Sequence, residues 1–220
     1  MILIPAHNEE KSLGTVLHRL QRYQSKDRVV VVNSCSTDQT AQIAAEWGAI
    51  VIDAPEIGYW NALCCGYRYA LEHNEPFVVQ MDADGQHPPH VLPRITAELQ
   101  QRDSLTWVVG SRYNTGTAMS VERKLAQQFF SRLLLQRTGI HLRDVSSGFW
   151  GLSSDVIQIL LDYPGQTADV VLRLYAIQQG VKIVEIPCAM EERLQGSSMH
   201  SGLTSMKYFY RIFQDLRSIS

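Results

Sequence analysis

The stretch VVQMDADGQHPP, residues 78–89, joins an apolar run to two aspartates one residue apart and ends in two prolines. A short run rich in Val is typical of a strand that is buried on both faces. Proline is favoured in the first turn of a helix, so the two prolines are expected to begin the next helix. If the chain stays extended beyond the apolar run, Asp82 and Asp84 point the same way, because side chains alternate along a strand. The stretch therefore predicts a buried strand that brings two carboxylates to one edge of a sheet.

Other apolar runs have the same character and alternate with segments of helical spacing. The predicted strands are residues 1–6, 28–33, 49–54, 77–83, 105–111 and 181–187. Repeated strand–helix–strand order favours an α/β fold with a mostly parallel central sheet and helices on both faces. The chain has 220 residues, 45% of them hydrophobic, which is enough for one large core, so a single domain over residues 1–220 is expected.

Helices are predicted from apolar spacing and from capping residues. Apolar residues at i, i+3, i+4 and i+7 predict a helix over residues 13–20. Ser36 or Thr37 is expected to cap a helix that begins near Asp38. A further helix is predicted over residues 124–138.

Two polar segments and the end of the chain are less regular. Residues 112–123 and 190–202 are rich in small polar residues and are predicted to be loops, the second of them mobile. Residues 203–219 have the spacing of an amphipathic helix. Its apolar face is expected to pack on the same domain, on a partner subunit of an oligomer, or on a membrane surface.

The charge balance and the cysteines restrict the class of protein. Twenty basic and 22 acidic side chains give a net charge of -2, so a nucleic-acid partner is not expected. No run of about 18 apolar residues is present, and the N-terminus lacks the pattern of a signal peptide. The four cysteines, Cys35, Cys64, Cys65 and Cys188, form neither a CxxC pair nor a regular framework. A cytoplasmic protein with reduced thiols, at most peripheral to the inner face of a membrane, is expected.

The carboxyl ends of the predicted strands are the places to look for a site. Polar segments follow four of them, with the sequences PAHNEE, NSCSTDQT, DADGQHPP and GSRY. In a parallel α/β sheet these ends meet at one edge, where ligands bind. Asp82, Asp84 and the amide oxygen of Gln86 are the oxygen ligands that Mg²⁺ or Mn²⁺ prefers. The alternative is that the two aspartates only cap the following helix, with their carboxylates in solvent.

Six segments, in order, together resemble the family 2 glycosyltransferases, particularly those that make polyprenyl-phosphate sugars. IPAHNEE resembles the family's P-x-Y-N-E opening, with His7 in place of Tyr, and Asp38 and Thr40 fit its D-D-G-S-x-D-x-T segment. DADGQHPP resembles the metal-binding D-x-D-x-x-H-P segment. GSRY, DVSSGFW and RLQGSS resemble its G-T-R-Y, D-x-x-S-G-F-R and R-x-x-G-x-S segments. Each segment alone is a weak signal, but their order extends over nearly the whole chain.

This resemblance implies a GT-A fold and a nucleotide-diphosphate-sugar donor held with Mg²⁺ or Mn²⁺. It implies that the sugar moves by single displacement with inversion, to a polyprenyl phosphate or a glycan acceptor. The residues that it implies for the nucleotide sugar are Pro5, His7, Glu9, Asn33, Ser34 and Asp82. The metal ligands would be Asp82, Asp84 and Gln86. Phosphate or acceptor contacts would come from Arg112, Arg123, Arg193 and Ser198, and catalysis would involve Asp84, Arg112 and Asp169.

Several positions depart from the family pattern and leave alternatives open. Asn33 and Ser34 stand where the family has two aspartates, so the nucleobase is not fixed, and Trp150 and Met199 replace common basic residues. Within residues 1–220 the sequence predicts no membrane helix of the kind that many polyprenyl-phosphate enzymes of the family carry. The acceptor could instead be a hydroxyl of a polysaccharide or envelope precursor, for which Asp169 would be the general base. Asp169 could equally be a residue at a helix N-terminus, and the protein could be a non-catalytic binder of nucleotide sugars.

Overall fold

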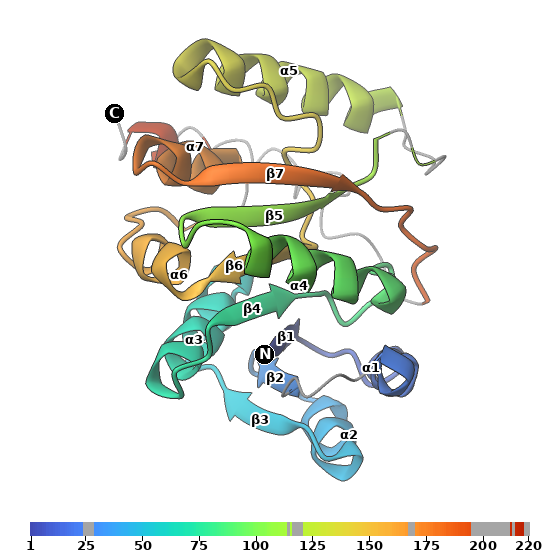
Figure 1. Cartoon of the computed structure of the whole chain (residues 1–220). Helices are drawn as coiled ribbons and strands as arrows, with labels where there is room; N and C mark the ends of the chain where they lie inside the picture. The colour runs from blue at the N-terminus through green and yellow to red at the C-terminus, as the bar shows by residue number, and fades with distance from the viewer. Residues whose placement is uncertain are drawn as a thin grey trace.

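The computed structural model describes residues 1–23, 29–113, 115, 121–166, 170–194, 212 and 214–217. Its centre is a seven-stranded sheet with the order β3-β2-β1-β4-β6-β5-β7. Helices cover the sheet (Figure 1). The strands are β1 (Ile2–Ala6), β2 (Val29–Asn33), β3 (Ile50–Asp53), β4 (Phe77–Gln80), β5 (Thr106–Ser111), β6 (Trp150–Ser153) and β7 (Lys182–Pro187). The helices are α1 (Leu13–Leu20), α2 (Thr40–Trp47), α3 (Tyr59–Glu72), α4 (Leu92–Gln101), α5 (Val121–Thr138), α6 (Ser154–Leu161) and α7 (Val170–Gln178), with short 3-10 turns at Gln21–Tyr23 and Pro89–Val91.

Both faces of the sheet are buried, as a mostly parallel sheet requires. Side chains of β1 alternate between two core clusters: Leu3 belongs to the cluster with α3, α6 and α7, whereas Ile2 and Ile4 belong to the cluster with α1, α2 and α4. The predicted α/β fold with helices on both faces is therefore confirmed.

One strand was not predicted. β6 pairs antiparallel with both β4 and β5, whereas the other pairings of the described strands are parallel. It has only four residues, WGLS, and follows directly on a polar segment, so its sequence lacks the long branched run that marked the other strands. Its partners on both sides, rather than its own composition, make it a strand.

Two predicted helix boundaries need correction, and a third predicted helix is described only in part. α2 begins at Thr40, whose backbone N–H donates to Asp38 Oδ1 at 3.0 Å. The predicted cap Ser36 instead accepts a hydrogen bond from the backbone N–H of Asn8 at 3.0 Å. Helix α5 begins at Val121, so the predicted loop over residues 112–123 ends earlier. Of the predicted helix over residues 203–219, the part at Gln214–Arg217 is helical, and most of the remainder lies outside the described residues. Among the described residues, no helix is both long and apolar enough to cross a membrane.

A buried cation anchors the segment that precedes β6. Arg173 of α7 is fully buried and lies 5.3 Å from the ring centroids of both Trp107 and Trp150. Its Nη2 donates a hydrogen bond to the carbonyl oxygen of Ser147 at 2.6 Å. Cation–π contacts of a desolvated guanidinium are among the stronger ones. Arg173 thereby fixes the loop that contains Ser147 and precedes β6.

Candidate active site at the carboxyl edge of the sheet

The DADGQ segment forms a turn rather than an extended strand. β4 ends at Gln80, and Gly85 has a positive φ of 82°, which glycine adopts without strain. The predicted alternation of side chains is therefore not what places the two carboxylates. Segment 191–194 lies against this turn, since the N–H of Leu194 donates to the Asp84 carbonyl at 3.0 Å and the N–H of Glu191 donates to the Gln86 carbonyl at 2.9 Å.

The same segment brings a cation to the turn. Arg193 Nη2 lies 2.8 Å from Asp84 Oδ2 and 3.5 Å from Gln86 Oε1. Burial raises the pKa of Asp84, and the neighbouring Asp82 raises it further. The predicted pair of carboxylates is thus accompanied by a basic partner, as electrostatics requires of two close acids.

Asp82 is held by a hydrogen-bond network that the sequence did not reveal. The hydroxyl of Tyr59, at the start of α3, donates to Asp82 Oδ1 at 3.0 Å. Gln80 Nε2 donates to the Tyr59 oxygen at 2.5 Å and to the Gly148 carbonyl at 2.7 Å. Burial raises the pKa of Asp82 to about 6, although the Tyr59 hydroxyl and Arg193 act to lower it. Asp82 is therefore a positioned carboxylate whose charge needs a cation.

His87 contacts the backbone of the DADGQ turn. Its Nδ1 accepts a hydrogen bond from the backbone N–H of Asp82 at 2.8 Å, and its ring stacks on Phe149 at 4.9 Å between centroids. Burial lowers the pKa of His87 to about 4, so the imidazole is neutral near pH 7. The accepted hydrogen bond requires this neutral state.

The ends of β1 and β2 lie beside this turn. His7 Nδ1 is 2.6 Å from the Ser34 carbonyl oxygen, and Pro5 lies within the buried strand β1. Glu9 is half-buried, and burial raises its pKa despite a hydrogen bond from the Ser12 hydroxyl. The charges of Asp84 and Arg193 also act on the Glu9 pKa, so Glu9 is within electrostatic range of the DADGQ turn.

Arg112 follows β5 and is held by a buried carboxylate. Its Nε and Nη2 donate to Asp144 Oδ2 and Oδ1 at 2.8 and 2.6 Å, and Nη2 also donates to the Ser146 hydroxyl at 2.9 Å. Burial tends to raise the pKa of Asp144, but the hydrogen bonds and charge of Arg112 hold it below its ordinary value. The guanidinium is therefore fixed in orientation.

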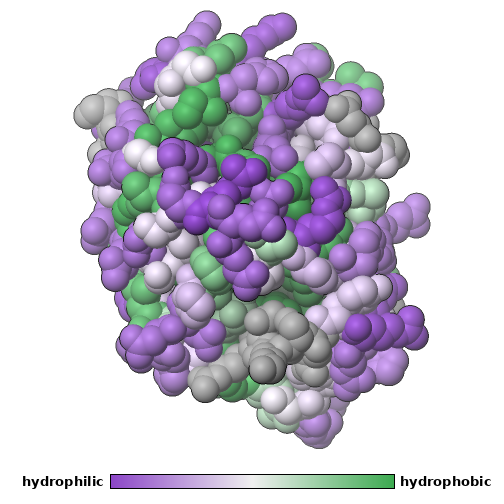
Figure 2. Space-filling view, viewed as in Figure 1, coloured by the Kyte–Doolittle hydropathy of each residue, from purple (hydrophilic) through white to green (hydrophobic). Residues whose placement is uncertain are grey.

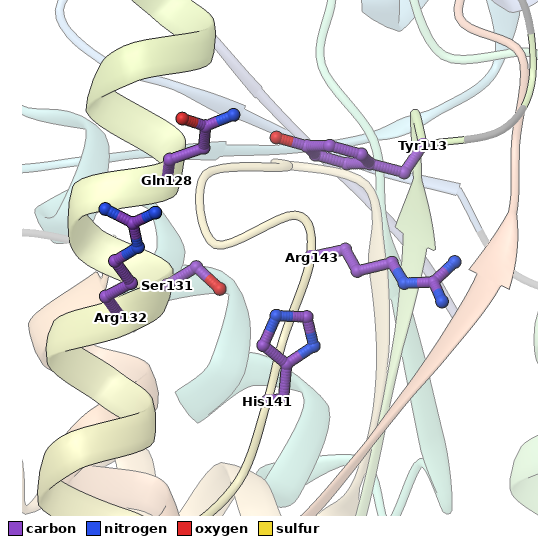
Figure 3. Close-up of a pocket in the computed structure, with 6 residues that line it drawn as sticks. All are labelled: Tyr113, Gln128, Ser131, Arg132, His141 and Arg143. Carbon is purple, nitrogen blue, oxygen red and sulfur yellow. The ribbon is translucent and has the colours of Figure 1, made fainter.

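A surface pocket lies next to Arg112, between Tyr113 and helix α5. It has a volume of ≈ 240 Å³ and is lined by Tyr113, Gln128, Ser131, Arg132, His141 and Arg143. In Figure 3 the Tyr113 hydroxyl points toward Gln128, and the His141 ring stands between Arg132 and Arg143. Two permanent cations border the pocket, so it favours an anionic ligand.

Three predicted site residues cannot be placed. Asp169 and Ser198 lie outside the described residues, and Arg123 belongs to α5 but its side chain is not among those described. The structure adds four residues that were not among the predicted site residues: Tyr59 and Gln80, which hold Asp82, His87, which accepts from its backbone, and Asp144, which holds Arg112. Of these four residues, His87 and Asp144 lie within two of the sequence segments that resemble the family, DADGQHPP and DVSSGFW.

The chemistry of the turn fits a hard divalent cation. Within the described residues, no cluster of three or more His, Cys, Asp or Glu side chains could hold a metal ion. The turn instead offers two carboxylates and an amide oxygen, and the oxygens of Asp84 and Gln86 already converge on one cationic atom, Arg193 Nη2. A small set of oxygen ligands is what Mg²⁺ or Mn²⁺ uses when phosphate oxygens complete its coordination.

The fold and this edge of polar strand ends define an α/β protein with a ligand site at the carboxyl ends of its strands. Residues 1–160 match Glycosyl transferase family 2, so the chain belongs to this family and is a glycosyltransferase. Two relatives extend over most of the chain. An undecaprenyl-phosphate mannosyltransferase of Micrococcus luteus is 29% identical, with 92% of this chain and 87% of the relative covered. A polyprenol monophosphomannose synthase of Mycolicibacterium smegmatis is 26% identical, with 96% and 84% covered.

Solved structures agree on the fold. Glucosyl-3-phosphoglycerate synthase of Mycobacterium tuberculosis, in complex with UDP, matches with a TM-score of 0.76 at 19% identity, over 97% of this chain and 78% of that one. The same enzyme has been crystallised with Mn²⁺, UDP and glucosyl-3-phosphoglycerate, and that structure matches with a TM-score of 0.73. The GT-A-like fold is therefore confirmed.

Proposed function

We propose that the protein transfers a sugar from a nucleoside-diphosphate donor to a polyprenyl phosphate, with inversion and with Mg²⁺ or Mn²⁺. The observation that carries this proposal is the DADGQ turn, where Asp84 and Gln86 oxygens meet one cationic atom beside the positioned carboxylate of Asp82. The relatives named above, one an undecaprenyl-phosphate mannosyltransferase and the other a polyprenol monophosphomannose synthase by name, support the class of acceptor. They also favour mannose as the sugar.

The donor end of the reaction follows from charge. Breaking the bond between sugar C1 and the diphosphate leaves negative charge on the nucleotide, so cations at that point accelerate the step if they bind the transition state more tightly. A divalent cation held by Asp82, Asp84 and Gln86 would supply Lewis-acid stabilisation there. Arg193, which reaches Asp84 from segment 191–194, is in position to meet the diphosphate once its carboxylate partner binds the metal.

The groups around Arg112, where the acceptor would bind, favour an anionic acceptor. Arg112 is oriented by Asp144 at the carboxyl end of β5, and Arg132 and Arg143 border the neighbouring pocket. A phosphate monoester is already an anionic nucleophile, so no general base is needed for its attack on C1. Attack from the face opposite the leaving diphosphate gives inversion.

The surface of α5 favours a lipid acceptor. Val121, Leu125 and Phe129 are 68, 62 and 56% exposed, and their spacing of four residues places them on one face of the helix. Figure 2 shows hydrophobic side chains reaching the surface at the top of the molecule, where α5 lies in Figure 1. Basic residues beside an exposed apolar face suit the surface of an anionic membrane, and peripheral binding at its cytoplasmic side would bring a polyprenyl phosphate within reach.

A hydroxyl acceptor is the alternative within the enzyme class. It would need a carboxylate to take the proton, for which Asp169 remains the candidate. A non-catalytic binder of nucleotide sugars is the alternative of another class. Turnover separates these functions, because a binder shows a nucleotide-dependent rise in melting temperature without product.

The test is sugar transfer in detergent micelles. GDP-mannose and UDP-glucose are each offered with undecaprenyl phosphate or with the corresponding free alcohol, in Mn²⁺ or in EDTA, and the lipid product is measured. We expect product only with the phosphate and the metal, and loss of at least a hundredfold in Asp84→Asn. Asp155→Asn, an exposed aspartate of α6, is the matched control. Transfer that continues in EDTA, or transfer to the alcohol alone, contradicts the proposal.

A further inference from the structure

The carboxyl ends of three neighbouring strands form a row. Ala6 of β1 is in register with Asn33 of β2, and Asn33 is in register with Asp53 of β3. Since β4 lies on the other side of β1 and strands are about 4.8 Å apart, Asp53 is three strands from the DADGQ turn. If the diphosphate of a nucleotide lies at that turn and the nucleotide extends along the row, its base reaches the ends of β2 and β3.

The two residues that stand in place of the family's aspartates make hydrogen bonds to protein groups. The Asn33 side chain is buried, and its Nδ2 donates to Asp53 Oδ1 at 2.7 Å while its Oδ1 accepts from the Ser36 N–H at 3.1 Å. Ser34 is also buried, and its hydroxyl accepts from the Gly58 N–H at 3.2 Å. Both side chains thus bind protein groups, and neither supplies a charge at this edge.

Asp53 supplies that charge instead. Its side chain is exposed at the end of β3, and the amide of Asn33 fixes the position of one oxygen. A carboxylate has several lone pairs, so it can accept a second hydrogen bond while it keeps the first. The negative charge that is absent at positions 33 and 34 is therefore present one strand further along the row.

We propose that Asp53 selects the nucleobase of the donor by accepting a hydrogen bond from a ring N–H. This inference rests on the proposed function, because it assumes a nucleotide with its diphosphate at the DADGQ turn. Uracil and guanine have a ring N–H on their pairing edge. Cytosine and adenine have an unprotonated ring nitrogen there, whose lone pair would face the carboxylate. Asp53 thus favours uracil or guanine over cytosine and adenine. The expected difference in affinity is roughly ten- to hundredfold, which is typical of a hydrogen bond to a charged group.

The test is the affinity of the protein for UDP, GDP, CDP, ADP and inorganic pyrophosphate, each with Mn²⁺, by calorimetry. The wild type is expected to bind UDP or GDP at least tenfold more tightly than CDP and ADP. Asp53→Asn is expected to lose at least tenfold for the preferred nucleotide and to keep its affinity for pyrophosphate. Asp103→Asn, which also removes an exposed carboxylate with a side-chain partner, is expected to change neither, and Asp53→Ser repeats the test without an amide.

Each other outcome overturns the inference in a recognisable way. If Asp53→Asn keeps the affinity and the preference of the wild type while Asp84→Asn loses binding, the proposed function stands and Asp53 has no role in base selection. If Asp53→Asn weakens pyrophosphate as much as the nucleotides, Asp53 only maintains the strand end. A wild type that prefers CDP or ADP contradicts the inference alone, and one that binds no nucleotide at all contradicts the proposed function as well.

Discussion

Arg193 and Asp84 form an ion pair at 2.8 Å, so the guanidinium is the cation that meets the carboxylate of Asp84 at the DADGQ turn. A divalent ion bound through Asp84 Oδ2 would compete with Arg193 for this oxygen. The pair links the turn after β4 to segment 191–194, which lies far away in the sequence. We therefore expect metal binding at this turn to be coupled to the position of that segment.

Replacement of Arg193 by Gln is expected to tighten Mn²⁺ binding in the absence of nucleotide. The reason is that the positive charge of Arg193 no longer competes with Mn²⁺ for Asp84. The affinity for Mn²⁺ is expected to rise about tenfold, equivalent to ~1.4 kcal/mol. Turnover should fall, because the same cation is lost from the diphosphate. Mn²⁺ titration followed by electron paramagnetic resonance measures the affinity. Arg19→Gln, which breaks the exposed pair with Glu191 of the same segment, is the control, and weaker Mn²⁺ binding in Arg193→Gln would contradict the coupling.

Arg112→Lys is expected to lower both stability and activity. The planar guanidinium donates two hydrogen bonds to the buried Asp144, and an ammonium group cannot reproduce this fork. Removing one partner of a buried pair costs about 3–5 kcal/mol, so Arg112→Met should reach this range and Arg112→Lys should lose somewhat less. Urea denaturation and transfer assays measure the two effects. Arg102→Lys changes an exposed pair with Glu98 and should alter the unfolding free energy by under ~0.5 kcal/mol.

The same ion pair predicts a pH dependence of stability. The folded-state pKa of Asp144 lies below its ordinary value of 3.8, because the hydrogen bonds and charge of Arg112 outweigh the effect of burial. For a carboxyl group of this kind, the stabilising contribution is present above the unfolded pKa and is lost as the pH falls through the folded pKa. The difference in unfolding free energy between wild type and Asp144→Asn should therefore be largest near pH 7 and shrink below about pH 4. A difference that stays constant from pH 7 to pH 3 would show that Asp144 does not titrate in this way.

Sequence periodicity was sufficient for the strands whose own composition decides their structure. Val29–Asn33 begins with four valines, and Thr106–Ser111 contains Thr, Trp and two valines in succession; both strands were predicted within one residue of their bounds. The strand Trp150–Ser153 was missed, because its structure depends on pairing with β4 and β5 on either side. Such pairing involves residues distant in sequence, which local periodicity does not encode.

The site shows the same limit. Polar strand ends predicted where the site lies, but not which groups meet there. Alternation along a strand suggested that Asp82 and Asp84 point the same way, whereas Gly85 turns the chain and Arg193 supplies the common cation. The contact of Asn33 with Asp53 likewise arises from strand register rather than from any motif.

Gly148 faces Asp82 and Tyr59 so closely that the site depends on its lack of a side chain. A Cβ atom at Gly148 would lie 3.1 Å from both Asp82 Oδ2 and the Tyr59 oxygen, and either the carboxylate or the hydroxyl would have to move. Gly148→Ala is therefore expected to weaken Mn²⁺ binding and turnover by about tenfold, while the free energy of unfolding changes by no more than ~1 kcal/mol.

Two further variants show whether this effect comes from the position of Asp82. Tyr59→Phe removes the hydrogen bond to Asp82 without added bulk and should weaken Mn²⁺ binding to a similar extent. Gly14→Ala adds a methyl group on α1 at an ordinary 3.7 Å from Ile43 and should leave Mn²⁺ binding unchanged, with stability equal or higher by up to ~1 kcal/mol. If Gly148→Ala loses stability but binds Mn²⁺ as the wild type does, Gly148 serves packing alone and the orientation of Asp82 does not limit metal binding.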